Sequence, residues 1–123
     1  MPNKIRKNGL HTTYYEKGQK QWVGNYKDGW KHGLEEYFHK NSQLEARENY
    51  KDGELDGLWE EFYENGQLEG KGNYKDGKED GLLERFFENG QLRARGNYKN
   101  GKLDGLWENF DEDGQKQSKL MGK

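Results

Sequence analysis

Short runs of alternating hydrophobic and polar residues, each about seven residues long, follow one another along the chain. Aromatic residues are frequent in these runs, and turn dipeptides such as Asn65-Gly66 and Asp76-Gly77 separate them. A period of two residues with aromatic enrichment is typical of β-strands. The sequence has no apolar pattern of useful length with the helical period. We therefore expect each pair of runs to fold as a β-hairpin.

The runs belong to a repeat of 24 residues, in which a Gly-Leu pair opens every copy and an Asn-Tyr-Lys motif recurs. Such a repeat predicts an array in which each unit packs only on its neighbours. The predicted fold is all-β: an elongated single-sheet antiparallel meander of about ten short strands, built from 24-residue β-hairpin repeats in a single repeat domain. The expected segments are a lead-in over residues 1–8, full copies over 9–32, 33–56, 57–80 and 81–104, and a partial copy over 105–123, with the repeat domain spanning 9–123.

Side-chain parity indicates the type of turn inside each copy. A two-residue loop at the Asn-Gly dipeptide would put Leu58 and Tyr74 on opposite faces of the sheet. A three-residue loop over residues 64–66, with a left-handed Gly66 that forms a bulge, puts them on the same face. Because burial requires the apolar side chains to share a face, we expect three-residue loops here and at residues 75–77.

One face of the predicted sheet collects rows of leucine, phenylalanine and tyrosine. We interpret these rows as a ladder of stacked side chains that replaces a globular core, with an aromatic ligand-binding channel as the alternative. The small residues Ala46, Gly70 and Ala94 lie between the rows and leave room for rings. The ladder residues are Leu34, Leu58, Leu82, Leu106, Phe38, Phe62, Phe86, Phe110, Tyr26, Tyr50, Tyr74 and Tyr98.

Two rows of acids lie on the same predicted face. A catalytic pair of carboxylates occurs once in a protein and is not copied along an array. We interpret the acids as solvated or hydrogen-bonded framework groups, with an acidic stripe for a basic partner as the alternative. The two rows are Glu36, Glu60, Glu84 and Glu108, and Asp56, Asp80 and Asp104.

The opposite predicted face carries an aromatic patch in the third, fourth and fifth copies. The first two copies have the more polar His11, Tyr15, Glu35 and His39 at the corresponding positions. Adjacent copies lie about 10 Å apart in such a sheet, so the patch is contiguous and is predicted to bind a protein partner. Packing of a curled sheet on itself or a homodimer contact explains the same residues. The predicted partner-binding residues are Trp59, Tyr63, Leu83, Phe87 and Trp107.

Composition narrows the range of functions. The 123 residues are 28% hydrophobic and 36% charged, and they include no cysteine, which excludes disulfides and thiolate metal sites. The histidines lack the spacing of a zinc site, and no Ser-His-Asp arrangement occurs. We therefore expect no enzyme activity, no metal and no cofactor.

Charge and hydropathy limit the partners and the compartment. The net charge of −2 gives no general attraction to nucleic acid. The sequence has neither a secretory signal nor an apolar run long enough to span a membrane, so a cytoplasmic location is expected. A weak phospholipid contact through lysines at the turns remains an alternative. These lysines are Lys27, Lys51, Lys75 and Lys99.

The unpaired edges of the first and last strands also favour association. An unpaired strand edge invites pairing with another chain. Homodimerisation through an edge or a face is therefore a further expectation.

The recurring motif Asn-Tyr-Lys-Asp-Gly-Lys-x-Asp-Gly-Leu-Trp resembles the bacterial variant of the MORN repeat. Its first half stands at residues 73–77 and its second half at residues 56–59, and the resemblance covers about 115 residues. The second copy departs from the pattern with Ser42 in place of the turn glycine and Glu48 in place of the counterpart of Gly72.

The resemblance implies an elongated β-meander that acts as a non-catalytic scaffold for protein contacts. It implies phospholipid binding for some members of the family. Bacterial members are often labelled antitoxin components of toxin–antitoxin pairs, so neutralisation of a cognate toxin by direct binding is an alternative function. The family supplies no catalytic residues that carry over to this chain.

Overall fold

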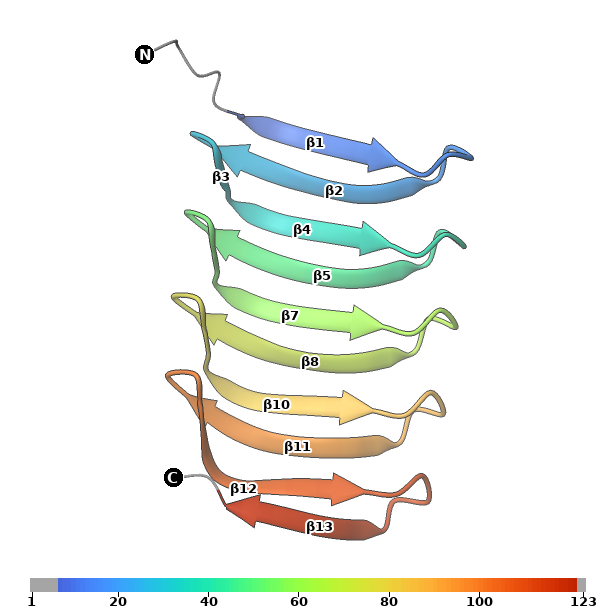
Figure 1. The fold of residues 1–123 in the computed structure, drawn as a ribbon, viewed down its shortest axis with the longest axis vertical. Helices are drawn as coiled ribbons and strands as arrows, with labels where there is room; N and C mark the ends of the chain where they lie inside the picture. The colour runs from blue at the N-terminus through green and yellow to red at the C-terminus, as the bar shows by residue number, and fades with distance from the viewer. Residues whose placement is uncertain (1–6, 122–123) are drawn as a thin grey trace.

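The computed structural model describes the backbone of residues 7–121 and the side chains of residues 7–117, so most of the predicted lead-in over residues 1–8 lies outside it. The described residues form one open antiparallel sheet without a helix (Figure 1), which confirms the predicted all-β meander. Ten strands follow one another across the sheet in sequence order, and three two-residue strands pair beside the turns. The ten are β1 (Gly9–Tyr14), β2 (Lys20–Lys27), β4 (Gly33–Phe38), β5 (Leu44–Lys51), β7 (Gly57–Phe62), β8 (Leu68–Lys75), β10 (Gly81–Phe86), β11 (Leu92–Lys99), β12 (Lys102–Phe110) and β13 (Lys116–Met121), and the three are β3 (Trp30–Lys31), β6 (Glu54–Leu55) and β9 (Lys78–Glu79).

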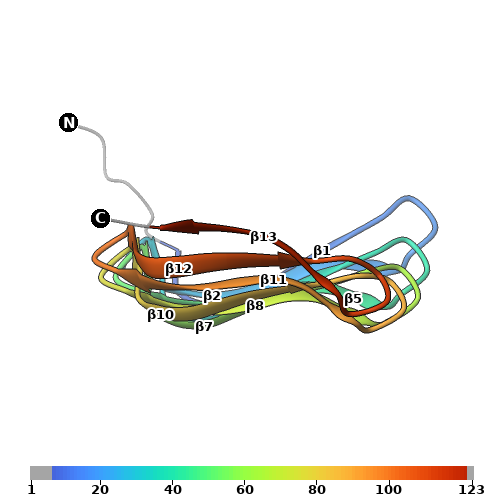
Figure 2. The ribbon, with the colours of Figure 1, turned by 90° about the horizontal axis from the view of Figure 1, so that it is seen from below.

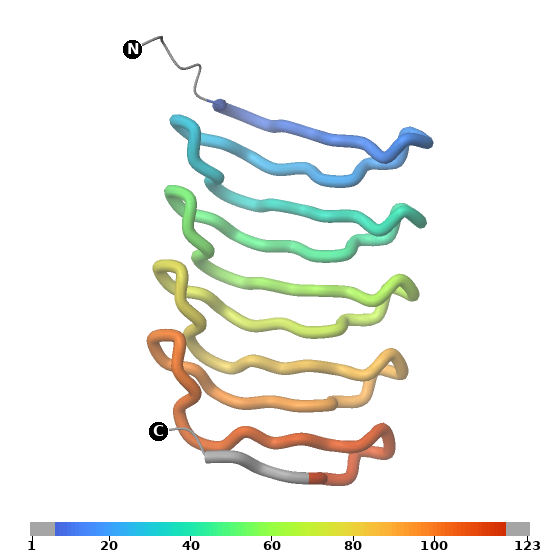
Figure 3. Tube along the Cα trace, in the orientation of Figure 1, coloured from blue at the N-terminus to red at the C-terminus, as the bar shows by residue number. Residues whose placement is uncertain are grey.

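The sheet is a single layer with its hairpins stacked at regular intervals along the long axis (Figure 3). Seen along that axis, the strands bow, and the turns lie at the two ends of the bow (Figure 2). In residues 7–121, β1 and β13 form the two outer edges of the sheet. No helix that is long and apolar enough to cross a membrane occurs in this part of the chain.

The predicted three-residue loop at the Asn-Gly turn is confirmed. Tyr63 and Gln67 close the loop through a backbone hydrogen bond of 2.9 Å, and the N–H of Gly66 donates to the carbonyl of Tyr63 (2.9 Å). Gly66 has a φ of 90°, the left-handed conformation that a glycine adopts without steric cost. Ser42 adopts the same conformation in the second copy, with a φ of 73°, so the turn geometry persists without the glycine.

A second irregularity in each hairpin was not predicted. Phe62 pairs with Leu68, whereas Glu61 pairs with Gly70, so Glu69 is an extra residue in the second strand. A bulge of this kind adds one residue to one strand and reverses the alternation of faces beyond it. Leu58 consequently pairs with Asn73, not with a residue of the parity of Tyr74.

The three-residue loop predicted over residues 75–77 is wrong. Lys75 pairs with Lys78, so only Asp76 and Gly77 form the loop, with φ values of 50° and 82°. Two left-handed residues define a type I′ turn, whose twist matches that of the adjoining strands. The preceding copy holds this turn in place, because the N–H of Gly77 donates to the carbonyl of Leu55 at 2.8 Å.

These two differences place the predicted ladder on two faces. The leucine and phenylalanine rows share one face, here named the leucine face, as expected. The row of Tyr26, Tyr50, Tyr74 and Tyr98 lies on the opposite face, here named the tyrosine face, so its predicted position beside the leucines is wrong. The small residues predicted on the leucine face, Ala46, Gly70 and Ala94, also lie on the tyrosine face.

The best-buried side chains lie on the tyrosine face. Ala46 is 9% exposed, Leu83 8%, Ala94 3% and Glu35 0%. Each of these residues belongs to a strand register that puts it beside the tyrosine row. The core of this single layer is therefore a row of packed side chains along the tyrosine face.

Candidate functional site

The predicted aromatic patch divides into two groups in the structure. Trp59, Leu83 and Trp107 form one row across the tyrosine face, with glycines on the strands between them. A Cβ at Gly96 would lie 2.6 Å from Cε3 of Trp107, and one at Gly72 would lie 2.9 Å from Cδ1 of Leu83. The glycines therefore leave the space that these side chains occupy. Burial of a leucine side chain is worth about 2 kcal/mol, so this row stabilises the sheet itself.

Tyr63 and Phe87 form the second group, at the Asn-Gly turns beyond the ends of β7 and β10. The hydroxyl of Tyr63 donates a hydrogen bond to the carbonyl of Phe86 in the next hairpin (2.7 Å). Tyr15 makes the equivalent bond to the carbonyl of Phe38, also at 2.7 Å. The tyrosine at this position thus connects adjacent hairpins, a contact that a phenylalanine at position 87 does not make.

Glu35 occupies the position that Trp59, Leu83 and Trp107 occupy in later copies, and its side chain is completely buried. Trp22 Nε1 donates to one carboxylate oxygen (2.7 Å), and the backbone N–H of Asn25 donates to the other (3.0 Å). Burial raises the pKa of this carboxyl above its ordinary value, although both hydrogen bonds favour the charged form.

A cluster of polar and aromatic groups surrounds this carboxylate. The Lys31 ammonium lies 3.9 Å from Glu35, donates to the hydroxyl of Tyr37 (3.2 Å) and stands 5.0 Å from the ring centre of Tyr50. The hydroxyl of Tyr50 in turn donates to Glu48 (3.2 Å). Burial and then the nearby charge of Glu48 raise the pKa of Tyr50 well above its usual range. The members of the cluster therefore satisfy one another's hydrogen bonds.

Sequence reasoning recognised that Glu35 breaks the aromatic row but missed this cluster. The signal was Trp22, which stands where later copies have Ala46, Gly70 and Ala94. A large indole at a position that is otherwise small indicates a local change in packing, and its N–H requires an acceptor when buried.

The cluster offers little chemistry to an external substrate. Glu35 has no exposed surface, so its carboxylate does not reach solvent. Among the described residues, no group of three or more histidines, cysteines, aspartates or glutamates is placed to hold a metal ion. The arrangement is that of a structural polar cluster.

The leucine face carries the most exposed apolar side chains of the sheet. Its leucines recur once in each copy, two strands apart, and none of them is covered by a second layer. An exposed apolar row of this kind is a candidate contact surface. The exposed fractions are 66% for Leu10, 41% for Leu34, 43% for Leu58, 43% for Leu82 and 44% for Leu106.

Of the two acid rows predicted on this face, the glutamate row is there, and three of its four members have a basic partner on the neighbouring strand. The ion pairs join Arg47 to Glu60 (2.7 Å), Lys71 to Glu84 (3.8 Å) and Arg95 to Glu108 (2.9 Å). Exposed pairs of this type contribute about 0–1 kcal/mol each. Their main effect is to neutralise the glutamates of the leucine face.

The lysine row predicted at the turns also lies on the leucine face. Each of these lysines follows a tyrosine of the opposite face, so its side chain points to the side of the leucines. All four are exposed, and none forms an ion pair with another described residue. The leucine face therefore combines an apolar row with a row of lysines, and Asp80 and Asp104 line the same open hollows as Lys75 and Lys99. The lysines are Lys27, Lys51, Lys75 and Lys99.

Shallow grooves separate successive leucines on this face. One groove, of about 230 Å³, lies between Leu58 and Leu82 and is also lined by Asn73. The next, of about 480 Å³, lies between Leu82 and Leu106 and is lined by the equivalent Asn97. The same combination of two leucines and one asparagine thus recurs one repeat further along the sheet.

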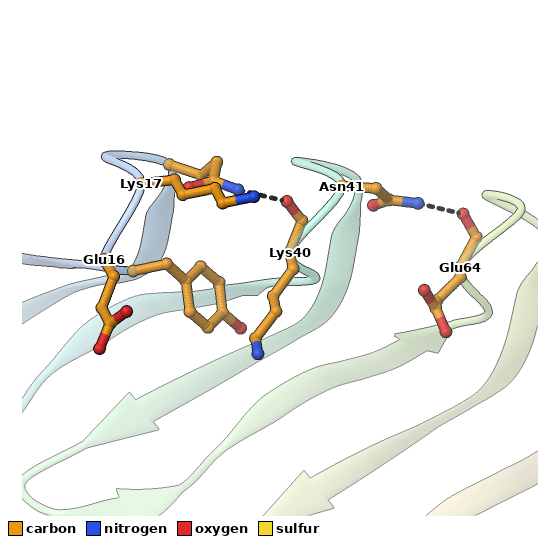
Figure 4. Close-up of a pocket in the computed structure, with 7 residues that line it drawn as sticks. Glu16, Lys17, Lys40, Asn41 and Glu64 are labelled. Atoms are coloured by element: carbon orange, nitrogen blue, oxygen red, sulfur yellow. Dashed lines mark hydrogen bonds between the residues drawn. The ribbon is translucent and has the colours of Figure 1, made fainter.

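A larger open hollow of about 690 Å³ lies between the first Asn-Gly-type turns and is lined mainly by polar residues (Figure 4). The side-chain amide of Gln19 donates to the carbonyl of Lys40 (2.9 Å), and that of Asn41 donates to the carbonyl of Glu64 (2.9 Å). These bonds join successive turns, so the hollow is the space between stacked loops and not a built ligand site.

Comparison with known proteins agrees with the repeat seen in the structure. A family model described as MORN repeat variant matches residues 31–52, 55–76, 79–100 and 103–123, which together make up more than half of the chain. A search of curated proteins found no similar sequence.

Proposed function

Because the chain belongs to the MORN repeat variant family, we propose that it is a non-catalytic repeat scaffold that binds a protein partner on its leucine face. The observation that carries this proposal is the row of leucines, each at least 41% exposed on a sheet that no second layer covers within residues 7–121. Burial of such a row against a partner removes apolar surface from water, which is the dominant favourable term in most protein associations.

The leucine face is favoured over the aromatic patch because its leucines keep more of their surface exposed. Trp59 and Trp107 are half-buried, and Leu83 is buried over glycines. Their contacts already stabilise the single layer. The leucines, by contrast, keep 41–66% of their surface exposed, which a partner would cover.

The test is capture of a partner by the immobilised chain, followed by rebinding of the purified partner. We expect Leu58→Glu combined with Leu82→Glu to abolish rebinding, because two charges would enter the centre of the interface. The matched control, Glu64→Ala combined with Glu88→Ala, changes exposed turn residues and should leave rebinding unchanged. Far-UV circular dichroism should be the same for both variants, and full rebinding by the leucine variant would contradict the proposal.

The aromatic patch is the second candidate surface, favoured by the clustering of Trp59, Leu83 and Trp107 in the later copies. Tyr63 and Phe87 would extend it at the turns. If this patch is the interface, Trp59→Ala combined with Trp107→Ala abolishes rebinding while circular dichroism stays unchanged. The same variant retains rebinding if the leucine face is the interface.

Phospholipid binding and neutralisation of a toxin are two further alternative functions. Because leucine and lysine rows share a face, peripheral binding to anionic phospholipid is testable by co-sedimentation with vesicles, and it should weaken as salt rises. Neutralisation of a toxin is testable by co-expression with a candidate toxin, where rescue of growth must be lost in the Leu58→Glu, Leu82→Glu variant.

A further inference from the structure

We propose that β1 pairs along its outer edge with β1 of a second copy of this chain, so that two sheets join through a two-fold axis into one longer sheet. This inference goes beyond the proposed function, because the contact lies at the edge of the sheet and leaves the leucine face open. Within residues 7–121, β1 pairs only with β2, and it lies at one end of the sheet (Figure 1). An unpaired strand edge is a template for another strand.

The first strand differs from the equivalent strands of the other copies in its charge. β1 has the sequence Gly-Leu-His-Thr-Thr-Tyr and contains no lysine, arginine, aspartate or glutamate. The equivalent strands β4, β7, β10 and β12 each contain at least one glutamate. Charged side chains on an edge strand protect it against association with other chains. β1 lies at the edge and lacks this protection.

The residue at position 12 makes pairing between two identical strands favourable. Thr12 stands where the following copies have Glu36 and Glu60. Two glutamate-bearing strands that paired with each other around this position would place two carboxylates directly opposite, which is destabilising. Two threonines opposite each other stabilise a strand pair. Pairing with an identical strand therefore suits β1 and does not suit its equivalents in the other copies.

The direction of the backbone groups sets the register of this pairing. The N–H of Tyr15 donates to the carbonyl of Gln19 inside the first hairpin (2.8 Å). The backbone groups of successive residues alternate in direction along a strand, so those of Leu10, Thr12 and Tyr14 point to the outer edge. Pairing of Thr12 with its own counterpart puts Leu10 opposite Tyr14 on both sides of the two-fold axis. All three residues then exchange backbone hydrogen bonds with the second copy.

The exposure of Leu10 and Tyr14 indicates the surface that the second copy would cover. Leu10 is 66% exposed, whereas the leucines at this position in later copies, which have a preceding hairpin beside them, are 41–44% exposed. Tyr14 is 59% exposed, and the phenylalanines at this position in later copies are half-buried. A second β1 would lie where the preceding hairpin lies in those copies. Aliphatic and aromatic side chains would then meet across the new strand pair.

The edge formed by β13 is less suited to receive a second copy head to tail. Tyr15 and Asn41 each donate a hydrogen bond to a carbonyl of the next hairpin (2.7 and 2.9 Å). Their equivalents beside β13 are Asp111 and Asp113, whose carboxylates only accept hydrogen bonds. Asp111 already accepts the N–H groups of Asp113 and Gln115 (3.0 and 2.9 Å). A head-to-tail contact would lack these bonds between hairpins, so the closed, symmetric pairing of β1 is favoured.

The symmetric contact would also enlarge the leucine face. Residues directly opposite each other in an antiparallel pair point to the same face of the sheet. The two leucine faces would therefore lie on the same side of the joined sheet. A partner with two binding segments would engage both faces, which raises its overall affinity without any new type of contact.

Sedimentation velocity of the full chain tests the pairing. A contact along one strand edge is smaller than a standard interface, so we expect a species of twice the 14.5 kDa of one chain that increases with concentration up to about 1 mM. Thr12→Glu should abolish this dimer and leave the circular dichroism unchanged, because the other copies hold a glutamate there. Gln115→Glu, the matched control, adds the same charge at an exposed turn residue and should keep the dimer. A monomer at every concentration, or assemblies that lengthen with concentration, would overturn the inference.

Paired variants test the symmetry and the register. Thr12→Lys alone should also be monomeric, whereas an equimolar mixture with Thr12→Glu should form dimers, because opposite charges then face each other. Under mild oxidation Thr12→Cys should form a disulfide between two chains, since the Cα atoms of a hydrogen-bonded pair are about 5.5 Å apart. Leu10→Cys should not, because the two Cα atoms would be about 15 Å apart. No dimer in the mixture, or equal cross-linking of both cysteine variants, would contradict the proposed pairing.

One comparison separates this inference from the proposed function. A dimer that persists in Thr12→Glu but is lost in the Leu58→Glu, Leu82→Glu variant would place the contact on the leucine face and refute the pairing of β1. Loss of the dimer in Thr12→Glu with the dimer kept in the leucine variant would support the pairing, whether or not the leucine variant rebinds a natural partner.

Discussion

The first two copies and the later copies fill the same backbone positions in different ways. In the first hairpin the large ring is that of Trp22, on the second strand. Its indole N–H donates to the buried Glu35 of the next copy. In the third hairpin the ring comes from Trp59 on the first strand, and it lies beside Gly70, where a Cβ would be 3.4 Å from Cη2 of the indole. The strand register is the same in both regions. The repeat therefore keeps the backbone constant, whereas the large side chain lies on the second strand in one hairpin and on the first strand in the other.

A carboxylate is accommodated at this position where neighbouring groups donate hydrogen bonds to it. Glu35 has an indole N–H, a backbone N–H and a lysine within reach. The equivalent Leu83 lies over Gly72 and close to other apolar groups. Exchanging the two residues should therefore have unequal effects.

The largest effect is expected for Leu83→Glu. A carboxylate there would be buried without the donors that Glu35 has, at a cost of about 3 kcal/mol. Leu82→Glu is the matched control, because the adjacent side chain is 43% exposed on the opposite face and should cost less than about 1 kcal/mol. Urea denaturation of the two variants gives both free energies, and equal losses would mean that the two faces are not distinct.

The next largest effect is expected for Gly24→Ala, at the glycine beside Glu35. A Cβ at Gly24 would overlap the carboxylate and push it away from Trp22 and Asn25. Loss of these buried hydrogen bonds should cost about 2 kcal/mol in urea denaturation. In a Glu35→Ala background the same substitution should cost less than about 1 kcal/mol, and an undiminished cost would show that the carboxylate is not what Gly24 accommodates.

These expectations also show how much the sequence determines. The 24-residue interval was enough to predict the meander, and the three-residue loop with a left-handed Gly66 followed from parity. The bulge at Glu69 has no residue signature, so regular alternation was assumed beyond Leu68 and the tyrosine row was placed on the wrong face.

The second turn has a sequence that favours a two-residue loop. Asp76-Gly77 is a dipeptide that favours a two-residue type I′ loop, and the structure has that loop. The requirement for one common apolar face does not hold in a single layer, because both faces of such a sheet meet solvent. The leucines predicted as a stacked ladder are therefore 41–44% exposed.

A smaller effect is expected at the turn of the second copy. Ser42 has a φ of 73°, where a side chain is sterically unfavourable. Ser42→Gly should stabilise the chain by about 0.5–1 kcal/mol, and Gly66→Ser in the third copy should destabilise it by a similar amount. Thermal denaturation of both variants tests this, and changes of the same sign would contradict the equivalence of the two turns.

The smallest effects on the free energy of unfolding are expected from a change of pH. Their signs are opposite for a carboxyl near each end of the sheet. The pKa of Glu35 is raised by burial, so the stability it contributes falls as pH rises from about 4.5 through its higher folded value. Hydrogen bonds from Lys116 and Arg95 lower the pKa of Glu108 to about 2, so its contribution is lost as pH falls from about 4.5 towards that value.

Substitution of each glutamate by glutamine separates the pH-dependent stability contributed by Glu35 from that contributed by Glu108. Glu35→Gln should flatten the decline of the urea midpoint on the alkaline side of pH 4.5, and Glu108→Gln should flatten the decline on the acid side. A shift in the same pH range for both variants would contradict the opposite environments of the two carboxyls.

The two-faced sheet is tested most directly by thiol labelling, because the chain has no cysteine of its own. Leu82→Cys and Leu83→Cys introduce single thiols at adjacent residues, and their rates of reaction with a thiol reagent are compared in the folded and the urea-unfolded chain. We expect the thiol at position 82 to react nearly as fast as in the unfolded chain and the thiol at position 83 to react about tenfold or more slowly. Protection at position 82 with free reaction at position 83 would contradict it.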